Sequence, residues 1–273
     1  MKLFINVRLL SVMVYGTGCL AQLQARAQVV ENYLVRYASV GCQTEIKING
    51  ITILTTDKGG GQIPISNLLT NGTNSIQVSS KVTDPRFENF ELRLVTLNDS
   101  NQTENVLFEC PPPADHNGVR SIETTGRFSA KIPFKWTWEE GSYKTNLSRS
   151  DQAEIYSVIE QVGDALRKKD LKRYNELQAA FIADCMRSEG VSSNSIAERI
   201  REVYEPLFAG KSFTVTVRPV EQLKMTPYGR ITVVEGLATT SGNWIIEMVS
   251  DEQHYSLLHL MFSDIRGKWR IMN

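Results

Sequence analysis

The sequence has few of the residues on which metal and nucleic-acid binding depend. Its 273 residues include only 3 histidines and 4 cysteines. Because 30 basic residues balance 30 acidic residues, the net charge is zero and no nucleic-acid partner is indicated. His254 and His259 are five residues apart on one predicted strand, so we expect them to face opposite sides. We therefore expect no metal site and no cofactor.

Long hydrophobic runs and catalytic signatures are also missing. No apolar run has the length of a transmembrane helix, so no membrane span is predicted. The glycine run Lys58–Gln62 lacks the Lys-Ser/Thr pair of a phosphate-binding loop. No Gly-x-Ser-x-Gly turn indicates a serine hydrolase. We therefore assign no catalytic residue.

The first 27 residues have the organisation of an export signal. Lys2 and Arg8 form a short basic start, and Leu9–Leu20 is apolar. Ala25-Arg26-Ala27 has the small-x-small pattern of a signal-peptidase site. We expect cleavage before Gln28 and a periplasmic or secreted protein.

The same segment also resembles a bacterial lipoprotein signal. Cleavage after Gly16-Thr17-Gly18 would leave Cys19 as the residue that carries the lipid. Such sites usually have an aliphatic residue where this chain has Gly16. A lipoprotein anchored at Cys19 is therefore the alternative to simple export.

Export changes the expected state of the cysteines. After cleavage before Gln28 the chain keeps Cys42, Cys110 and Cys185, and disulfides persist in an oxidising compartment. Because Cys42 and Cys110 both fall in the strand-rich first part, we predict a disulfide between them. Cys185 lies on the apolar face of a predicted helix, where we expect a buried free thiol.

Residues 28–148 have the pattern of an antiparallel β-sandwich. Glu45–Leu54 alternates in hydrophobicity on both sides of an Asn-Gly pair, which is typical of a tight hairpin. More alternating segments follow at short intervals, separated by glycine and asparagine turns. The segments Ile63–Leu69 and Asn71–Val78 resemble sandwich modules of exported bacterial proteins.

An aromatic strand is predicted near the end of this domain. Phe134–Trp138 places Trp136 and Trp138 two positions apart, so both rings would lie on the same side of a strand. We interpret the pair as a core or inter-domain contact. The domain boundary is expected after Ser148.

Residues 149–273 predict helices followed by strands. Three apolar stripes at helical spacing follow the helix starts that we assign to Asp151, Asp170 and Ser195. From Phe213 onward the period changes to two, as in strands. Helices first and an antiparallel sheet afterwards is the order of an α+β domain.

This second domain resembles the nuclear transport factor 2-like superfamily. The resemblance rests on Lys169-Asp170-Leu171 at the start of the second helix and on the hairpin Asp264–Ile271. It implies an α+β cone, in which three helices pack on a bent antiparallel sheet around a pocket. Members include ketosteroid isomerase, dehydratases and non-enzymatic binding or assembly domains, so the fold does not choose the function.

The pocket implied by this resemblance is the expected ligand site. We assign to it Tyr156, Tyr174, Asp184, Tyr204 and Trp244. An isomerase would need a carboxylate base and oxyanion donors in that pocket. No residue matches the catalytic pattern of the isomerase family, so none of its roles is carried over.

The combined features predict an exported bacterial-type two-domain binding protein that is not an enzyme. Its partner is expected to be a protein or a small-molecule ligand in the cell envelope. The alternative is a small isomerase or hydrolase that uses the pocket of the second domain. A homodimer through the C-terminal sheet is compatible with either function.

Overall fold

The chain divides into two compact units, each of which is described by itself. In the computed structural model the first unit is Val29–Lys135, and the second contains Trp136–Asn273. The predicted signal segment, Cys19 and the cleavage site before Gln28 lie outside the described residues. The structure describes residues 31–56, 59–84, 89–98, 103–116, 119–237, 244–251 and 253–272.

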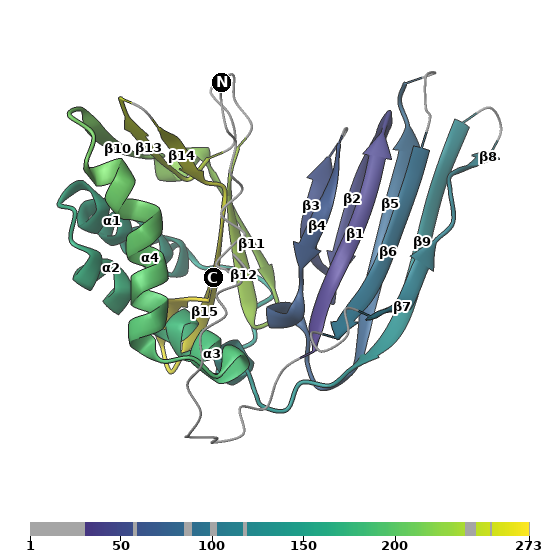
Figure 1. Cartoon of the computed structure of the whole chain (residues 1–273), viewed down its shortest axis with the longest axis horizontal. Helices are drawn as coiled ribbons and strands as arrows, with labels where there is room; N and C mark the ends of the chain where they lie inside the picture. Colours follow the sequence, from purple (N-terminus) through teal and green to yellow (C-terminus); the bar gives the residue numbers. More distant parts are fainter. Residues whose placement is uncertain are drawn as a thin grey trace. The chain divides into compact units, whose positions relative to one another are not determined.

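Helices and antiparallel sheets both occur, as the predicted α+β class requires (Figure 1). The described residues contain four α-helices, all in the second unit. Within these residues no helix combines the length and the mean hydropathy that a membrane span needs.

The first unit consists of strands. Four of them form an antiparallel sheet in the order β4-β1-β6-β7, and five form a second antiparallel sheet in the order β3-β2-β5-β9-β8. The elements are β1 (Asn32–Val40), β2 (Cys42–Ile48), β3 (Ile51–Thr56), β4 (Gly60–Pro64), the 3-10 helix η1 (Ser66–Leu68), β5 (Gly72–Val82), β6 (Asn89–Asn98), β7 (Thr103–Cys110), β8 (Ala114–His116) and β9 (Val119–Ala130).

Alternating burial gives the sheets of this unit their apolar faces. Every second residue of β2 is buried, from Cys42 to Ile48. Phe108 of β7 lies against Gly126 of β9, where an added Cβ would come within 2.3 Å of the ring. The two sheets therefore touch at a point where only a glycine leaves room for the phenylalanine.

The predicted bridge between Cys42 and Cys110 is not present. Both thiols are free and buried, and so is that of Cys185. Cys110 ends the edge strand β7, which lies against β9, whereas β5 separates β9 from the strand that carries Cys42. Two strand spacings of about 4.8 Å each exceed the Cα separation that a disulfide tolerates. Burial raises the pKa of the Cys110 thiol to about 11.

The second unit places its helices before its strands along the chain. The strands form a three-stranded sheet, β10-β13-β14, and a four-stranded sheet, β11-β12-β15-β16. The elements are the 3-10 helix η2 (Thr137–Glu140), α1 (Arg149–Arg167), α2 (Leu171–Leu177), α3 (Ala179–Glu189), α4 (Ser193–Phe208), β10 (Phe213–Val217), the 3-10 helix η3 (Val220–Gln222), β11 (Leu223–Tyr228), β12 (Ile231–Gly236), β13 (Ile246–Ser250), β14 (His254–Leu257), β15 (His259–Ile265) and β16 (Lys268–Ile271).

One apolar core joins the helices of this unit to both of its sheets. Helix α1 contributes a fully buried stripe that includes Ile155, Ile159 and Leu166. The same cluster contains Met248 of the three-stranded sheet and Phe262 of the four-stranded sheet. Figure 1 shows the four helices gathered on one side of these strands.

The two sheets are connected where β14 leads into β15, and the alternation of inward and outward side chains shifts by one residue there, at Leu258. Leu257 and Leu260 both lie in the core although they are three residues apart, so the alternation of the strand is interrupted between them. His254 and His259 therefore both face away from the core, and the prediction that they face opposite sides is wrong. Their nitrogens lie 2.7 Å and 3.1 Å from the carboxylates of separate glutamates on β13 and β12.

The helix starts differ in detail from those predicted. Ser148 caps α1, because its hydroxyl accepts from the amide of Asp151 at 3.1 Å and the Asp151 carboxylate accepts from the amide of Ser148 at 2.9 Å. Helix α4 is capped by Ser192 instead of Ser195. The predicted second helix is two helices that meet at Gln178, so there are four helices where three were predicted.

Residues 136–148 pack with the second unit, although the predicted boundary assigns them to the first. Trp136 is buried and Thr137–Glu140 form a 3-10 helix, so the predicted strand with Trp136 and Trp138 on one side does not form. The local backbone bonds of η2 replace those of a sheet ladder.

Lys144 links residues 136–148 to α1 and to β15 through two ion pairs. Its ammonium lies 3.2 Å from the carboxylate of Asp151 and 3.3 Å from that of Asp264. The indole of Trp269 donates to Asp151 at 3.3 Å, and the Lys144 ammonium lies 5.6 Å from the centroid of the indole ring. The hydrogen bonds and charges of the two carboxylates raise the pKa of Lys144.

Replacing Gly163 tests how α1 packs on β10. In an exposed helix Gly→Ala would stabilise by about 1 kcal/mol. Here the new Cβ would lie 2.2 Å from Cγ2 of Val217, so we expect Gly163→Ala to destabilise the protein. The expected loss is about 1–3 kcal/mol in urea unfolding. In the double variant with Val217→Ala the loss should be smaller than the sum of the single losses, and additive losses would contradict the contact.

The carboxylate of Asp151 predicts an acid-sensitive part of the stability. Burial alone would raise its pKa, but the amide and hydroxyl of Ser148 and the ammonium of Lys144 outweigh burial and lower the pKa to about 2. An unfolded aspartate has a pKa of about 3.9, so ionised Asp151 stabilises the fold above about pH 4, and this contribution is lost as the pH falls towards 2.

Asp151→Asn is therefore expected to cost about 1–2 kcal/mol at neutral pH, with the difference from wild type shrinking between about pH 4 and pH 2. Urea unfolding at a series of pH values measures this difference. Glu198→Gln, on an exposed position of α4, is the matched control and should behave as wild type. A difference for Asp151→Asn that does not change with pH would contradict the assignment.

Candidate functional site

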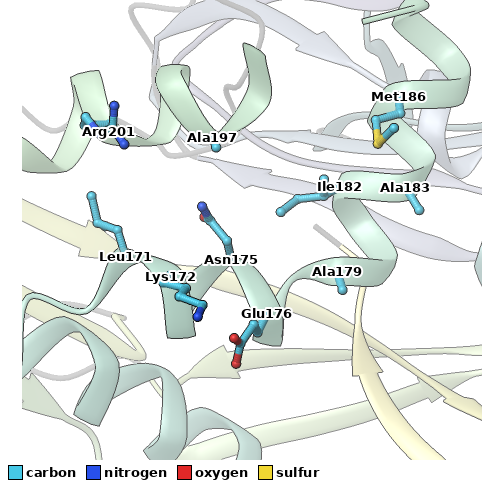
Figure 2. A pocket seen from close by; sticks show the side chains of 10 residues that line it. All are labelled: Leu171, Lys172, Asn175, Glu176, Ala179, Ile182, Ala183, Met186, Ala197 and Arg201. Carbon is cyan, nitrogen blue, oxygen red and sulfur yellow. The ribbon is translucent and has the colours of Figure 1, made fainter. Parts of the chain in front are cut away.

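A groove between α2, α3 and α4 is the candidate functional site. It has a volume of about 490 Å³, which is in the range of small-ligand sites (Figure 2). The lining residues are Leu171, Lys172, Asn175 and Glu176 of α2, Ala179, Ile182, Ala183 and Met186 of α3, and Ala197 and Arg201 of α4.

Helix α3 forms one wall through a second apolar stripe. One face of the helix carries the positions i, i+3, i+4 and i+7, which are Ala179, Ile182, Ala183 and Met186. We call these four residues the α3 stripe. The opposite face carries the buried Asp184, so the stripe is directed outward, and Met186 is 37% exposed.

Polar groups lie along the α2 and α4 walls. The side-chain oxygen of Asn175 is inaccessible to water and has no hydrogen-bond partner among the described residues. Figure 2 shows the amide of Asn175 directed towards α4. Glu176 and Arg201 form exposed ion pairs of 3.1 Å and 3.3 Å with neighbours on their own helices. Exposed pairs of this kind are weak and exchange readily for other partners.

The two predicted pocket residues Tyr174 and Tyr204 are packed against each other in the core. Their hydroxyl oxygens are 2.7 Å apart, and the rings meet edge to face with centroids 5.0 Å apart. Burial raises the pKa of both phenols, that of Tyr204 well above its ordinary value. One hydroxyl thus donates to the other in the core of the unit, and burial favours neutral phenols over a reactive phenolate.

Asp184, the predicted pocket carboxylate, binds the segment that precedes α1. It accepts from the amide of Thr137 at 3.0 Å and 3.2 Å, from the hydroxyl of Thr137 at 2.8 Å, and from the guanidinium of Arg187. Burial raises the pKa of Asp184 above its ordinary value, although the bonds from Thr137 and the charge of Arg187 oppose the shift. These contacts give the carboxylate an anchoring role between α3 and η2.

Tyr156 and Trp244 are also engaged in contacts of their own. The hydroxyl of Tyr156 donates to Glu160 at 2.7 Å, and burial together with the charge of Glu160 raises its pKa to about 12. The ring of Trp244 covers the guanidinium of Arg218, with 4.3 Å between the ring centroid and the guanidinium carbon. Arg218 itself is 1% exposed and donates to the carbonyl of Leu237.

Of the five residues assigned to a pocket, only Tyr174 and Tyr204 share a contact that the structure establishes. None of the five lines the α2–α4 groove. The sequence does carry a signal for this groove in the α3 stripe. The prediction missed it because alanine and methionine are common on any helix surface, and the stripe competes with a stronger apolar face of α3 that includes Phe181 and Cys185.

The groove has the chemistry of a contact surface. Its apolar side chains suit the burial of another apolar surface, and its few charges suit the orientation of a partner. Within the described ranges, no group of three or more histidine, cysteine, aspartate or glutamate side chains is arranged to hold a metal ion. Comparisons with protein-family models, curated proteins and solved structures gave no match.

The role of Asp184 can be measured through stability. Asp184→Ala removes the acceptor for both Thr137 donors and leaves Arg187 without its carboxylate, so we expect a loss of about 2–4 kcal/mol in urea unfolding. Asp184→Asn keeps one acceptor oxygen and should lose less. If Asp184→Ala is as stable as wild type, the carboxylate does not anchor η2 to α3.

Proposed function

We propose that this chain is an exported, non-enzymatic two-domain binding protein that engages a partner through the α2–α4 groove. The partner class is a protein or a small ligand of the cell envelope. The observation that carries the proposal is the groove itself, a cleft of about 490 Å³ with apolar walls and charged rims.

The engagement of the other candidate residues supports a binding function. Tyr174 and Tyr204 bind each other, and the Asp184 carboxylate binds Thr137 and Arg187. A general base or an oxyanion donor must instead be free to meet a substrate. In the groove, the exposed side chain of Met186 is available to another molecule.

The proposed architecture is a β-sandwich followed by an α+β cone of the nuclear transport factor 2-like type. Two antiparallel sheets in the first unit support the sandwich, and helices packed on two linked sheets support the cone. The basic start, the apolar run and Ala25-Arg26-Ala27 motivate export to the periplasm or the medium, with a lipid anchor at Cys19 as the alternative. A homodimer through the C-terminal sheet stays a separate prediction.

The alternative function is a small isomerase or hydrolase with its site in the second unit. It would use hydroxyls such as those of Tyr174 and Tyr204, which are fully buried and mutually bonded. Catalysis there would require an opening of the helix layer that exposes both rings. The binding function needs no such rearrangement, and we therefore favour it.

Affinity capture from the native envelope tests the proposal. The mature chain beginning at Gln28 is the bait, in wild-type form and with Ala183→Glu, which puts a charge on the exposed α3 stripe. We expect wild type to retain a partner and Ala183→Glu to lose about tenfold or more of it, since one charge in an apolar contact weakens binding by at least this factor.

Ala153→Glu is the matched control, because Ala153 is an exposed alanine on α1 outside the groove. It should retain the partner as wild type does. Recovery of no partner by wild type, together with turnover of ester or ketone substrates from a panel, would contradict the binding function in favour of the enzyme. Equal recovery by wild type and Ala183→Glu would show that the groove is not the binding surface.

A further inference from the structure

We propose that one end of the four-stranded sheet, where the chain turns from β11 to β12 and from β15 to β16, binds an acidic segment of a partner protein. We call this end the turn surface. Its exposed side chains are those of Tyr143, Arg230, Arg266, Lys268 and Arg270. None of them lines the α2–α4 groove, so this inference goes beyond the proposed function and does not depend on it.

The two turns lie at the same end of the sheet. Gly229-Arg230 joins β11 to β12, and Arg266-Gly267 joins β15 to β16. Strands β12 and β15 are antiparallel neighbours, in which Thr232 pairs with Phe262. The turn before Thr232 and the turn after Phe262 therefore lie side by side, and side chains from both can meet one partner.

Tyr143 is an exposed aromatic side chain on a fixed backbone, and it is 71% exposed. The amide of Ser142 donates to the carbonyl of Asp264 at 2.8 Å, and the amide of Lys144 donates to the carbonyl of Gly229 at 2.7 Å. The ring itself rests on Gly229, where an added Cβ would come within 2.8 Å of it. Because the ring is already positioned, covering it with another surface costs little conformational freedom.

Arg266 has a strained backbone and a side chain that its own unit hardly uses. Its φ is 54°, in the left-handed region that such residues rarely adopt. Two other described residues besides glycine have a positive φ, Asn49 and Lys169, and each donates to a backbone carbonyl through its side chain. The side chain of Arg266 is instead 87% exposed and lies 3.9 Å from the carboxylate of Glu140. Strain that no internal contact explains motivates a role in binding.

The charges of the turn surface fit an acidic partner. Arg230, Lys268 and Arg270 are exposed, and with Arg266 they supply four cations. Among the described residues, the one ion pair of these four cations is the long pair of Arg266 with Glu140. Arginine binds carboxylates through two parallel hydrogen bonds, and tyrosine and arginine are enriched at the centres of protein contacts. A protein segment fits better than an anionic lipid surface, because a uniform layer of anions would repel Glu140.

Fluorescence anisotropy with a labelled peptide that alternates glutamate and leucine tests this inference on the mature chain beginning at Gln28. We expect wild type to bind this peptide and to ignore a peptide with lysine in place of glutamate. Arg266→Gly removes one cation and suits the left-handed turn. It should therefore bind about tenfold more weakly while its Tm rises by about 2 °C, so that misfolding does not account for the loss. A wild type that does not bind the acidic peptide, or an Arg266→Gly variant that binds it equally well, overturns the proposal.

Two control variants and a cross-link locate the binding surface. Lys168→Gln removes an exposed cation outside the turn surface, and Ala183→Glu changes the groove, so both should bind the peptide as wild type does. Carbodiimide should join a glutamate of the bound peptide to Lys268, which mass spectrometry of the digest detects. Cross-links to other lysines without Lys268 overturn the assignment. Binding to vesicles of phosphatidylglycerol and phosphatidylcholine without binding to the peptide overturns the protein partner in favour of a lipid surface.

Discussion

The second unit depends on the packing of one helix face against a sheet that changes direction. Ile155, Ile159 and Leu166 of α1 are fully buried, and each buried aliphatic side chain contributes about 1.5–3 kcal/mol. The sheet can wrap this face because the strand shifts phase at Leu258, which keeps Leu257 and Leu260 both in the core. Without that shift, one of the two linked sheets would turn its polar side towards the helices.

Polar anchors then attach the segment before α1 to this core. Thr137 is held by Asp184, and Lys144 is held by Asp151 and Asp264. These partly buried charges are compensated by hydrogen bonds and by each other, which is the condition for retaining them inside a fold. Their consequence for function is that the buried carboxylate of α3, that of Asp184, is used in assembly of the unit and is not left for chemistry.

The remaining contact surface lies on the outside of the helices. The tyrosine pair joins α2 to α4 inside the core, and the groove is bordered by the α3 stripe, Glu176 and Arg201. An apolar stripe with charges only at its rims is the usual anatomy of a protein contact.

The sequence by itself determined the order of helices and strands, the hairpins and the helix caps to within a few residues. Periodicity and turn chemistry are local, as at Asn49-Gly50, where both residues have positive φ. Only the tertiary structure decided the break at Gln178, the phase shift at Leu258, the free thiols and the partner of Asp184. Each depends on residues far apart in the chain, such as the 47 positions between Thr137 and Asp184, and local periodicity does not report contacts of that kind.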